Sequence, residues 1–137
     1  MGLFDLFGKK DVSEDISKKL PFILVTEFVP YRLKSRQKNN CTLNLRIKNI
    51  TKEPVLSSIV IEVPKQLSFD AMGISKQKEV KLGNLAPNEE KFSSIDIHGG
   101  VGTDKGSYTL TLTAFVHYRD YAHVINEMRK RTILEVI

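Results

Sequence analysis

The sequence predicts an all-β protein, an antiparallel sandwich of about seven or eight strands, and two segments carry most of that prediction. In residues 41–49 every second side chain is apolar, and this set comprises Cys41, Leu43, Leu45 and Ile47. A period of two is typical of a strand with one face buried and one face in water. Residues 108–118 show the same period, with threonines on the opposite face from Tyr108, Leu110, Leu112, Ala114 and Val116. Prolines and glycines interrupt the chain between the two segments, as turns between strands require.

The other strands are predicted in order from Pro21 onward. The first is nearly continuously apolar and rich in β-branched residues, and the proline at its end suits an edge strand. The later ones are runs of strand-forming residues between turn signals. The predicted strands are residues 22–29, 41–50, 55–63, 78–82, 91–97, 106–118 and 124–136, with residues 67–71 as a shorter piece. The predicted loops and turns are residues 32–40, 51–54, 83–89, 98–105 and 119–123.

Length and composition predict one sandwich domain over residues 20–137, preceded by an N-terminal segment and tether over residues 1–19. A chain of 137 residues that is 41% hydrophobic can fill one core but not two. No stretch is long and apolar enough to span a bilayer, and the N-terminus lacks the pattern of a signal peptide, so we expect a cytoplasmic protein. The single cysteine, Cys41, is expected to be a reduced and inert core thiol.

The N-terminal segment differs in composition from the rest of the chain, and two interpretations of it stay open. Its apolar residues lie beside two lysines, and the polar stretch 11–19 that follows can serve as a tether or a short frayed helix. The apolar group can fold back onto the sandwich, or it can form a short amphipathic anchor in a membrane surface or a partner's groove. The candidate anchor residues are Leu3, Phe4, Leu6 and Phe7.

The excess positive charge of the chain comes from one segment. The formal net charge is +5, whereas residues 1–27 and residues 53–137 each sum to −1. Residues 28–52 hold seven basic side chains and no acidic one. They can form a solvated loop and strand face, or a patch for an anionic partner such as nucleic acid or lipid. The candidate residues for binding an anionic partner are Arg32, Lys34, Arg36, Lys38, Arg46, Lys48 and Lys52.

The segment 43–49 ends in an asparagine before a turn, and the segment 59–67 ends in a proline and then a leucine. The turn over residues 82–89 contains a leucine, an alanine, a proline, Asn88 and a glutamate in that order. Through these segments residues 21–137 resemble the immunoglobulin-like modules known as CARDB and NEW3-type (APHP-like) domains of archaea and bacteria, with 43–49 similar to their second strand. Asn88 stands where the family's turn has a glycine, and asparagine tolerates the left-handed conformation better than most residues. The resemblance implies an immunoglobulin-like sandwich and is nearly silent on function, because such modules serve as spacers, adhesins, scaffolds and enzyme appendages.

Residues 104–108 also fit the tyrosine corner of immunoglobulin folds. In that motif a tyrosine hydroxyl donates a hydrogen bond to nearby backbone at the entrance to the penultimate strand. Here the tyrosine is Tyr108. In antibody domains a cysteine lies two residues later, but this chain has Leu110 at that position, so Cys41 has no partner across the core.

No residue pattern points to catalysis, a metal or a cofactor. His117, Asp120 and His123 flank the predicted last hairpin, but the alternation places His117 on the outward face, where a solvated histidine is expected. Residues 99–102 are rich in glycine but lack the Lys-Ser/Thr ending and the following helix of a phosphate-binding loop. No nucleophile stands in a recognisable context, and the adjacent glutamates at 89 and 90 are expected to point apart on a turn. We therefore expect a protein that is not an enzyme.

The sequence thus favours a non-enzymatic protein-interaction or scaffold module. Residues 1–10 are the candidate contact with a membrane surface. The alternative is a nucleic-acid-binding β domain that uses residues 32–52, although no aromatic side chain for stacking on bases lies among these basic residues. The partner and the oligomeric state cannot be predicted from one chain.

Overall fold

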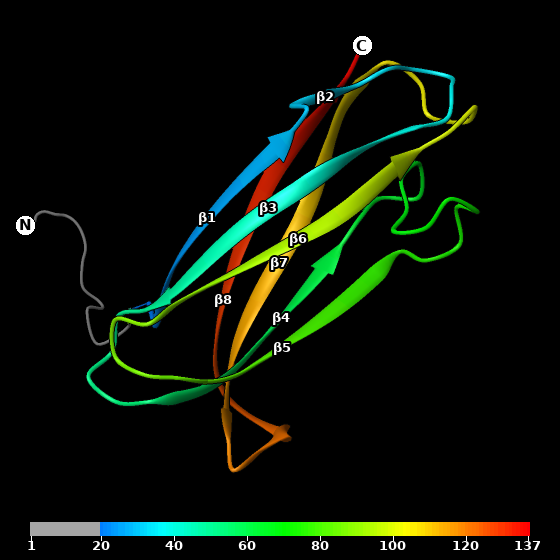
Figure 1. Cartoon of the computed structure of the whole chain (residues 1–137). Coiled ribbons are helices and arrows are strands. Elements are labelled where there is room, and N and C mark those ends of the chain that lie inside the picture. The colour runs from blue at the N-terminus through cyan, green and yellow to red at the C-terminus, as the bar shows by residue number, and fades with distance from the viewer. Residues whose placement is uncertain (1–19) are drawn as a thin grey trace, which may run out of the picture.

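The computed structural model describes residues 20–137, which form two β-sheets packed face to face (Figure 1). One sheet has three strands in the order β1-β3-β6, and the other has five in the order β2-β8-β7-β4-β5. All neighbouring strands are antiparallel except β2 and β8, which are parallel. The strands are β1 (Phe22–Val29), β2 (Arg32–Leu33), β3 (Asn39–Asn49), β4 (Val55–Glu62), β5 (Gln77–Leu85), β6 (Glu90–Gly99), β7 (Gly106–Tyr118) and β8 (Asp120–Val136).

The core lies between the two sheets and is built from the inward rows of their strands. Alternate residues of β3 are buried, and β7 presents a matching buried row from the other sheet. These rows belong to one cluster of buried side chains, in which branched aliphatic residues predominate. The predicted all-β sandwich is therefore confirmed, including the inward face of β3. The fully buried large aliphatic side chains include Leu43, Ile47, Ile59, Ile61, Ile97, Leu110, Leu112 and Leu134.

Three local features of the predicted fold are also present. The Tyr108 hydroxyl donates to the carbonyl oxygen of Asp104 at 2.7 Å, which is the bond of a tyrosine corner. Asn88 has a φ of 67°, the left-handed conformation that glycine would otherwise supply. Cys41 is buried and unpaired, and its burial raises the pKa of its thiol to about 11 because the thiolate would be poorly solvated there.

Four of the predicted element boundaries are wrong. Residues 67–71 form no strand, and only a single bridge joins Ser68 to His98. The expected loop after Arg32 contains the two-residue strand β2, which pairs with the end of β8. β5 continues through the predicted turn to Leu85, because Gly83 takes a φ of 74° at a bulge in β5 opposite Ser57 and Ser58 and lets the pairing continue. The turn predicted over residues 119–123 is much tighter, since β7 and β8 already pair across Arg119.

One open side of the sandwich is closed by a long side chain from β8. Lys130 lies on the inward row of β8 opposite Leu112, and its Nζ donates to the carbonyl oxygen of Leu24 on β1 at 2.8 Å. An inward lysine near a strand edge disfavours pairing with another chain, because a new strand would have to displace its charge.

The first prediction concerns the two central strands. Leu45→Ala and Leu112→Ala should each lower the free energy of unfolding by about 2–5 kcal/mol, since each leaves a cavity among buried neighbours. Thr111→Ala, on the outer face of β7, should cost well under about 1 kcal/mol. Urea unfolding of the three variants measures these costs. Equal small costs at all three positions would contradict the register.

The second prediction concerns Cys41. With a thiol pKa of about 11, about one molecule in a thousand carries the thiolate at pH 8. A thiol reagent should therefore label the native protein far more slowly than the denatured protein. The pKa of the Cys41 thiol in the folded state is above its unfolded value of about 8.5. The buried protonated thiol therefore contributes fully to the free energy of unfolding below that pH, and this contribution is lost as the pH rises toward 11. Native labelling at the rate of an exposed thiol would show that the side chain is accessible.

Candidate functional site

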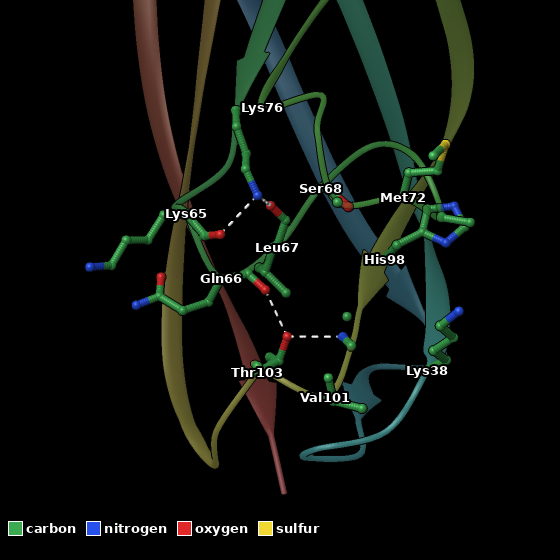
Figure 2. A pocket seen from close by; sticks show the side chains of 15 residues that line it. Lys38, Lys65, Gln66, Leu67, Ser68, Met72, Lys76, His98, Val101 and Thr103 are labelled. Carbon is green, nitrogen blue, oxygen red and sulfur yellow. Dashed lines mark hydrogen bonds between the residues drawn. The ribbon is translucent and has the colours of Figure 1, made fainter.

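A pocket lies at the end of the sandwich where β4, β6 and β7 meet their connecting loops (Figure 2). Its cavity measures about 280 Å³. Three chain segments line it: the connection 64–76 between β4 and β5, residues 98–103 at the end of β6 and in the loop after it, and Lys38 directly before β3. We call it the loop pocket.

Two polar side chains hold the walls of the loop pocket together. The Lys76 Nζ donates to the carbonyl oxygens of Lys65 at 2.8 Å and Leu67 at 2.6 Å. The buried Thr103 hydroxyl donates to the carbonyl oxygen of Gln66 at 2.7 Å and accepts from the backbone N–H of Gly100 at 3.0 Å. Figure 2 shows these bonds: those of Lys76 lie within the connection 64–76, whereas the bond from Thr103 to Gln66 crosses to that connection from the other loop. The Thr103 bond thereby fixes the two loops to each other although they lie far apart in sequence.

The charged side chains that line the loop pocket are basic. They are Lys38, Lys65 and Lys76, with His98 beside them, and no carboxylate is among the described lining residues. In Figure 2 the side chains of Lys38 and Lys65 extend on opposite sides, and the amine of Lys76 is turned toward the carbonyl oxygens that it bonds. This spacing places cations along the mouth of the pocket and not around a single point.

The nearest acidic side chain is held by its own loop. The carboxylate of Asp70 accepts hydrogen bonds from the backbone N–H groups of Ile74 at 2.9 Å and Ser75 at 3.2 Å. The bond from Ile74 is the main cause that lowers the pKa of Asp70, and the nearby His98 lowers it further. Asp70 is therefore ionised and bonded within its own loop, and the lysines of the pocket make no ion pair with it.

Apolar side chains at the tips of the same loops stand in solvent. Met72 is 82% exposed and Val101 is 77% exposed, and both line the loop pocket. Ile74 next to them is 71% exposed. Exposed apolar groups beside cations are typical of a surface that contacts a partner with both properties.

The structure divides the predicted basic residues among three places. Residues 32–38 lie at the end that carries the loop pocket, where Lys38 lines the cavity and Arg36 pairs with Asp104 at 2.8 Å. Arg46 and Lys48 project from the outer face near the end of β3, and Lys52 lies in the turn that follows, at the opposite end of the sandwich. The seven residues therefore do not form one patch.

Sequence reasoning missed Lys65, Lys76 and His98 as members of a site. Lys65 and Lys76 come from the connection 64–76 and His98 from the end of β6, and no fixed spacing links them to Lys38. The only signal was compositional, because two of these loops are rich in glycine, proline and lysine.

A second exposed surface covers the outer face of the three-stranded sheet. Strand register places Val25, Arg46 and Phe92 in one row across β1, β3 and β6. Phe92 is 71% exposed, and Arg46 lies 3.4 Å from the carboxylate of Glu90. A shallow groove runs beside this row. We call it the sheet groove.

His117 is on the outer face of β7 as expected, but the expectation that it is solvated is wrong. It is only 7% exposed, and its Nε2 lies 2.6 Å from the hydroxyl of Ser58. The ring of Tyr121 covers it edge-on at a centroid distance of 5.0 Å. Sequence alternation gives the face of a strand residue but not what folds over that face, and here the hairpin that begins β8 folds over it.

The other histidine of that hairpin stands in solvent. His123 Nδ1 lies 2.8 Å from Asp120, and this contact is the main cause that lowers the pKa of the Asp120 carboxyl. Within residues 20–137, no three His, Cys, Asp or Glu side chains come close enough together to hold a metal ion.

The anchor candidates Leu3, Phe4, Leu6 and Phe7 lie outside the described residues. In the part of the chain that is described, no helix has the length and apolar character needed to cross a membrane.

Comparison with known proteins identifies the fold. No model of a known protein family matches the chain, and no curated protein matches its sequence. Many solved structures match it in three dimensions. The alpha-2-macroglobulin of Escherichia coli, from domain MG7 to the C-terminus, matches with a TM-score of 0.63 and 17% identity over 85% of this chain. Our chain spans only 16% of that one.

Two further structures match over most of their own length. The CARDB domain of the PF1109 protein from Pyrococcus furiosus, solved in complex with di-metal ions, has a TM-score of 0.52 and 15% identity, covering 85% of this chain and 87% of that one. A chain of the complex between Zinc 2-glycoprotein and Prolactin inducible protein from human seminal plasma has a TM-score of 0.51 and 18% identity, covering 84% and 94%.

These likenesses and the two-sheet topology define the class of the protein as an immunoglobulin-like β-sandwich module. Within this class the chain resembles a CARDB domain, as its sequence motifs predicted.

Proposed function

We propose that this protein is a non-enzymatic interaction module that binds an acidic segment of a partner protein across the loop pocket. The observation that carries the proposal is the set of lysines along the mouth of the pocket, with no carboxylate among its described lining residues. Charge complementarity of this kind favours an acidic partner and speeds its encounter with the surface.

The arrangement of the lysines favours an extended segment over a small ion. Lys38 and Lys65 stand on opposite sides of the cavity (Figure 2), so that carboxylates several ångströms apart can contact them separately. Met72 and Val101 beside them offer apolar contacts. A partner segment that alternates acidic and apolar residues matches both features.

The geometry offers little support for catalysis at this site. A nucleophile needs a base within hydrogen-bonding distance, and the two hydroxyl side chains in the lining make other bonds. Thr103 donates to Gln66, and Ser68 donates to the carbonyl oxygen of Asp70 at 2.6 Å. The lining groups therefore suit binding and not bond-breaking.

The third prediction tests the loop pocket with a labelled ten-residue peptide that alternates glutamate and leucine. Lys38→Gln combined with Lys65→Gln should weaken binding by about threefold to tenfold, because each exposed ion pair contributes roughly 0.2–1 kcal/mol. The matched control is Lys48→Gln with Lys52→Gln, which removes the same charge elsewhere and should change the affinity less than about twofold. Fluorescence anisotropy measures both variants. Equal losses in the two pairs would mean that only net charge matters.

A single-stranded oligonucleotide in the same assay tests the alternative function, which is nucleic-acid binding through residues 32–52. Binding to phosphates releases counterions, so the affinity should fall steeply with salt concentration. An oligonucleotide that binds more tightly than the peptide, and that loses affinity in the Lys48 and Lys52 control, would favour nucleic acid as the partner. Phe92→Ser provides a further control, because it alters the sheet groove and leaves the loop pocket intact.

We further propose that the N-terminal segment holds the module at a membrane surface. The support is its composition, four large apolar side chains beside two lysines within ten residues. The described chain begins next to Phe22, which pairs with Asn49 at the end of the sandwich opposite to the loop pocket. A membrane contact there would leave the loop pocket facing away from the surface.

The fourth prediction tests this contact in the full-length chain. Phe4→Ser combined with Phe7→Ser should abolish co-sedimentation with anionic vesicles, because burying each phenylalanine contributes about 1.5–3 kcal/mol. The melting temperature should stay unchanged. A melting temperature lower by several degrees would show instead that these side chains pack on the sandwich.

A further inference from the structure

The outer face of the five-stranded sheet carries side chains in rows that the strand register defines. Strands β8, β7, β4 and β5 lie side by side in that order (Figure 1). The even-numbered residues of β7 from 110 to 116 face the core, so the odd-numbered ones and the residues that pair with them face outward. Three rows cross all four strands, and we call them the four-strand face. From β8 to β5 the rows are Glu127, Phe115, Ser58 and Lys81, then Arg129, Thr113, Val60 and Glu79, and then Arg131, Thr111, Glu62 and Gln77.

Most charges of the four-strand face lie along its two sides. The first row has Glu127 at one side and Lys81 at the other, and the second row has Arg129 and Glu79 in these places. Each of the two rows therefore ends in opposite charges, and the order of the charges is reversed from one row to the next.

The middle of the four-strand face is largely uncharged. Thr113 and Ser58 are buried there, and Val60 and Phe115 are half-buried. Within the three rows Glu62 is the one charged residue of the two central strands. A weakly charged middle between polar sides is the layout of a protein–protein interface.

The charges at the sides are held weakly within the chain itself. Arg129 lies 3.7 Å from the carboxylate of Glu127, and both side chains are half exposed. The amine of Lys81 lies 5.1 Å from the centre of the Tyr121 ring. Within residues 20–137, neither Arg131 nor Glu79 makes an ion pair. Exposed pairs of this kind contribute little to folding, so these charges are free to contact another molecule.

We propose that the four-strand face binds the same face of a second copy of this chain, in a dimer whose two-fold axis lies in the interface parallel to the strands. Rotation about this axis keeps each row at its height and reverses its order, so that β8 of one copy lies over β5 of the other. Arg129 then faces Glu79 of the second copy, and Glu127 faces Lys81 of the second copy. Each contact occurs twice, because a two-fold interface uses the same surface on both partners.

The charge pattern selects this axis over the other one that brings the two faces together. A two-fold axis perpendicular to the strands would place β8 over β8 and β5 over β5. Centred on the second row, that axis sets Arg129 against Arg129 of the second copy and Glu79 against Glu79 of the second copy. Like charges that face each other across an interface repel, whereas the parallel axis makes every contact between the charged ends attractive or neutral.

The short side chains of the middle allow the two sheets to approach each other. Packed sheets lie about 10 Å apart with their strands within about 30° of each other. Val60 of each copy then lies over Thr113 of the other. Glu62 lies over Thr111 of the second copy, next to Arg131 of that copy, so it too gains an opposite charge.

The size of the four-strand face predicts a weak dimer. Tyr121 stands over His117 and limits the face at one end. Beyond the third row the face continues with Ile133, which is 57% exposed and pairs with Thr109. Four strands at about 4.8 Å spacing make the patch roughly 20 Å wide and of similar length, or on the order of 400 Å². This is less than the roughly 800 Å² per partner of a standard interface, so we expect a dimer that forms at high protein concentration.

The proposed dimer does not depend on what the loop pocket binds. Because the strands of both copies run in the same direction about this axis, the two loop pockets lie at the same end of the dimer. A partner with two binding segments could contact both pockets at once and gain affinity by avidity.

Sedimentation equilibrium of the full-length chain tests the dimer. The wild-type protein should associate reversibly to a dimer at concentrations up to about 0.5 mM, and less so at high salt. Arg129→Glu and Glu79→Arg should each weaken dimerisation by about fivefold or more, because each reversal turns two attractive pairs into two repulsive ones. A wild-type protein that stays monomeric overturns the proposal.

Combining the two reversals tests which residues face each other. The double variant Arg129→Glu with Glu79→Arg should dimerise as the wild type does, since the pair is restored with its charges exchanged. An equimolar mixture of the two single variants should also form a dimer, because each variant supplies the charge that the other lacks. A loss in the single variants that neither the double variant nor the mixture restores overturns the proposal.

Arg46→Glu provides the matched control on the outer face of the other sheet. Arg46 is also an exposed arginine beside a glutamate, at 3.4 Å from Glu90, and the substitution changes the net charge by the same amount. It should alter dimerisation less than about twofold. Circular dichroism should show that all variants keep the wild-type fold, since exposed substitutions cost little stability. Equal association of the wild type and every variant would mean that the chains meet through another surface, which overturns the proposal.

Discussion

The packing of two inward rows of aliphatic side chains, one from each sheet, is the constraint on which the rest of this structure depends. A slip of one residue in β3 would turn Arg46 and Lys48 into the core and the buried leucines into water. The register is therefore fixed along the whole length of the central strands. Because the register is fixed, the points where strands end are fixed too, and those points decide which loop residues meet.

Buried polar side chains then fasten the loops at each end of this core. Asn49 is fully buried, and its amide donates to the carbonyl oxygens of Glu53 at 2.8 Å and Leu85 at 2.9 Å. Thr103 bridges the loops at the other end. Both residues are paired, as burial requires. His117 differs from them, because within residues 20–137 only its Nε2 has a hydrogen-bond partner.

The sequence predicted the sheets better than the loops, and the reason is physical. Alternation is a local signal, so it revealed the inward faces of β3 and β7. The tyrosine corner at Tyr108 followed from the resemblance of residues 104–108 to the motif of immunoglobulin folds. Alternation could not reveal β2, whose two residues pair with the end of β8 about a hundred residues away. It also predicted a strand over residues 67–71, where apolar side chains pack on the core but only the single bridge from Ser68 to His98 forms. The loop pocket was predictable only at Lys38, since its other members meet through tertiary contacts.

The two ends of the sandwich are far apart, and this distance bears on how the proposed loop-pocket site can act. β7 runs from the end that carries the loop pocket to the hairpin with β8, and its 13 residues span about 40 Å at roughly 3.3 Å per residue. At that distance exposed charges are screened from each other at physiological salt, so charges at one end have little direct electrostatic effect at the other. The core between the two ends consists of close-packed aliphatic side chains. A partner held at the loop pocket would therefore leave the surface at the hairpin end open to a second contact, and this arrangement suits the interaction module proposed above.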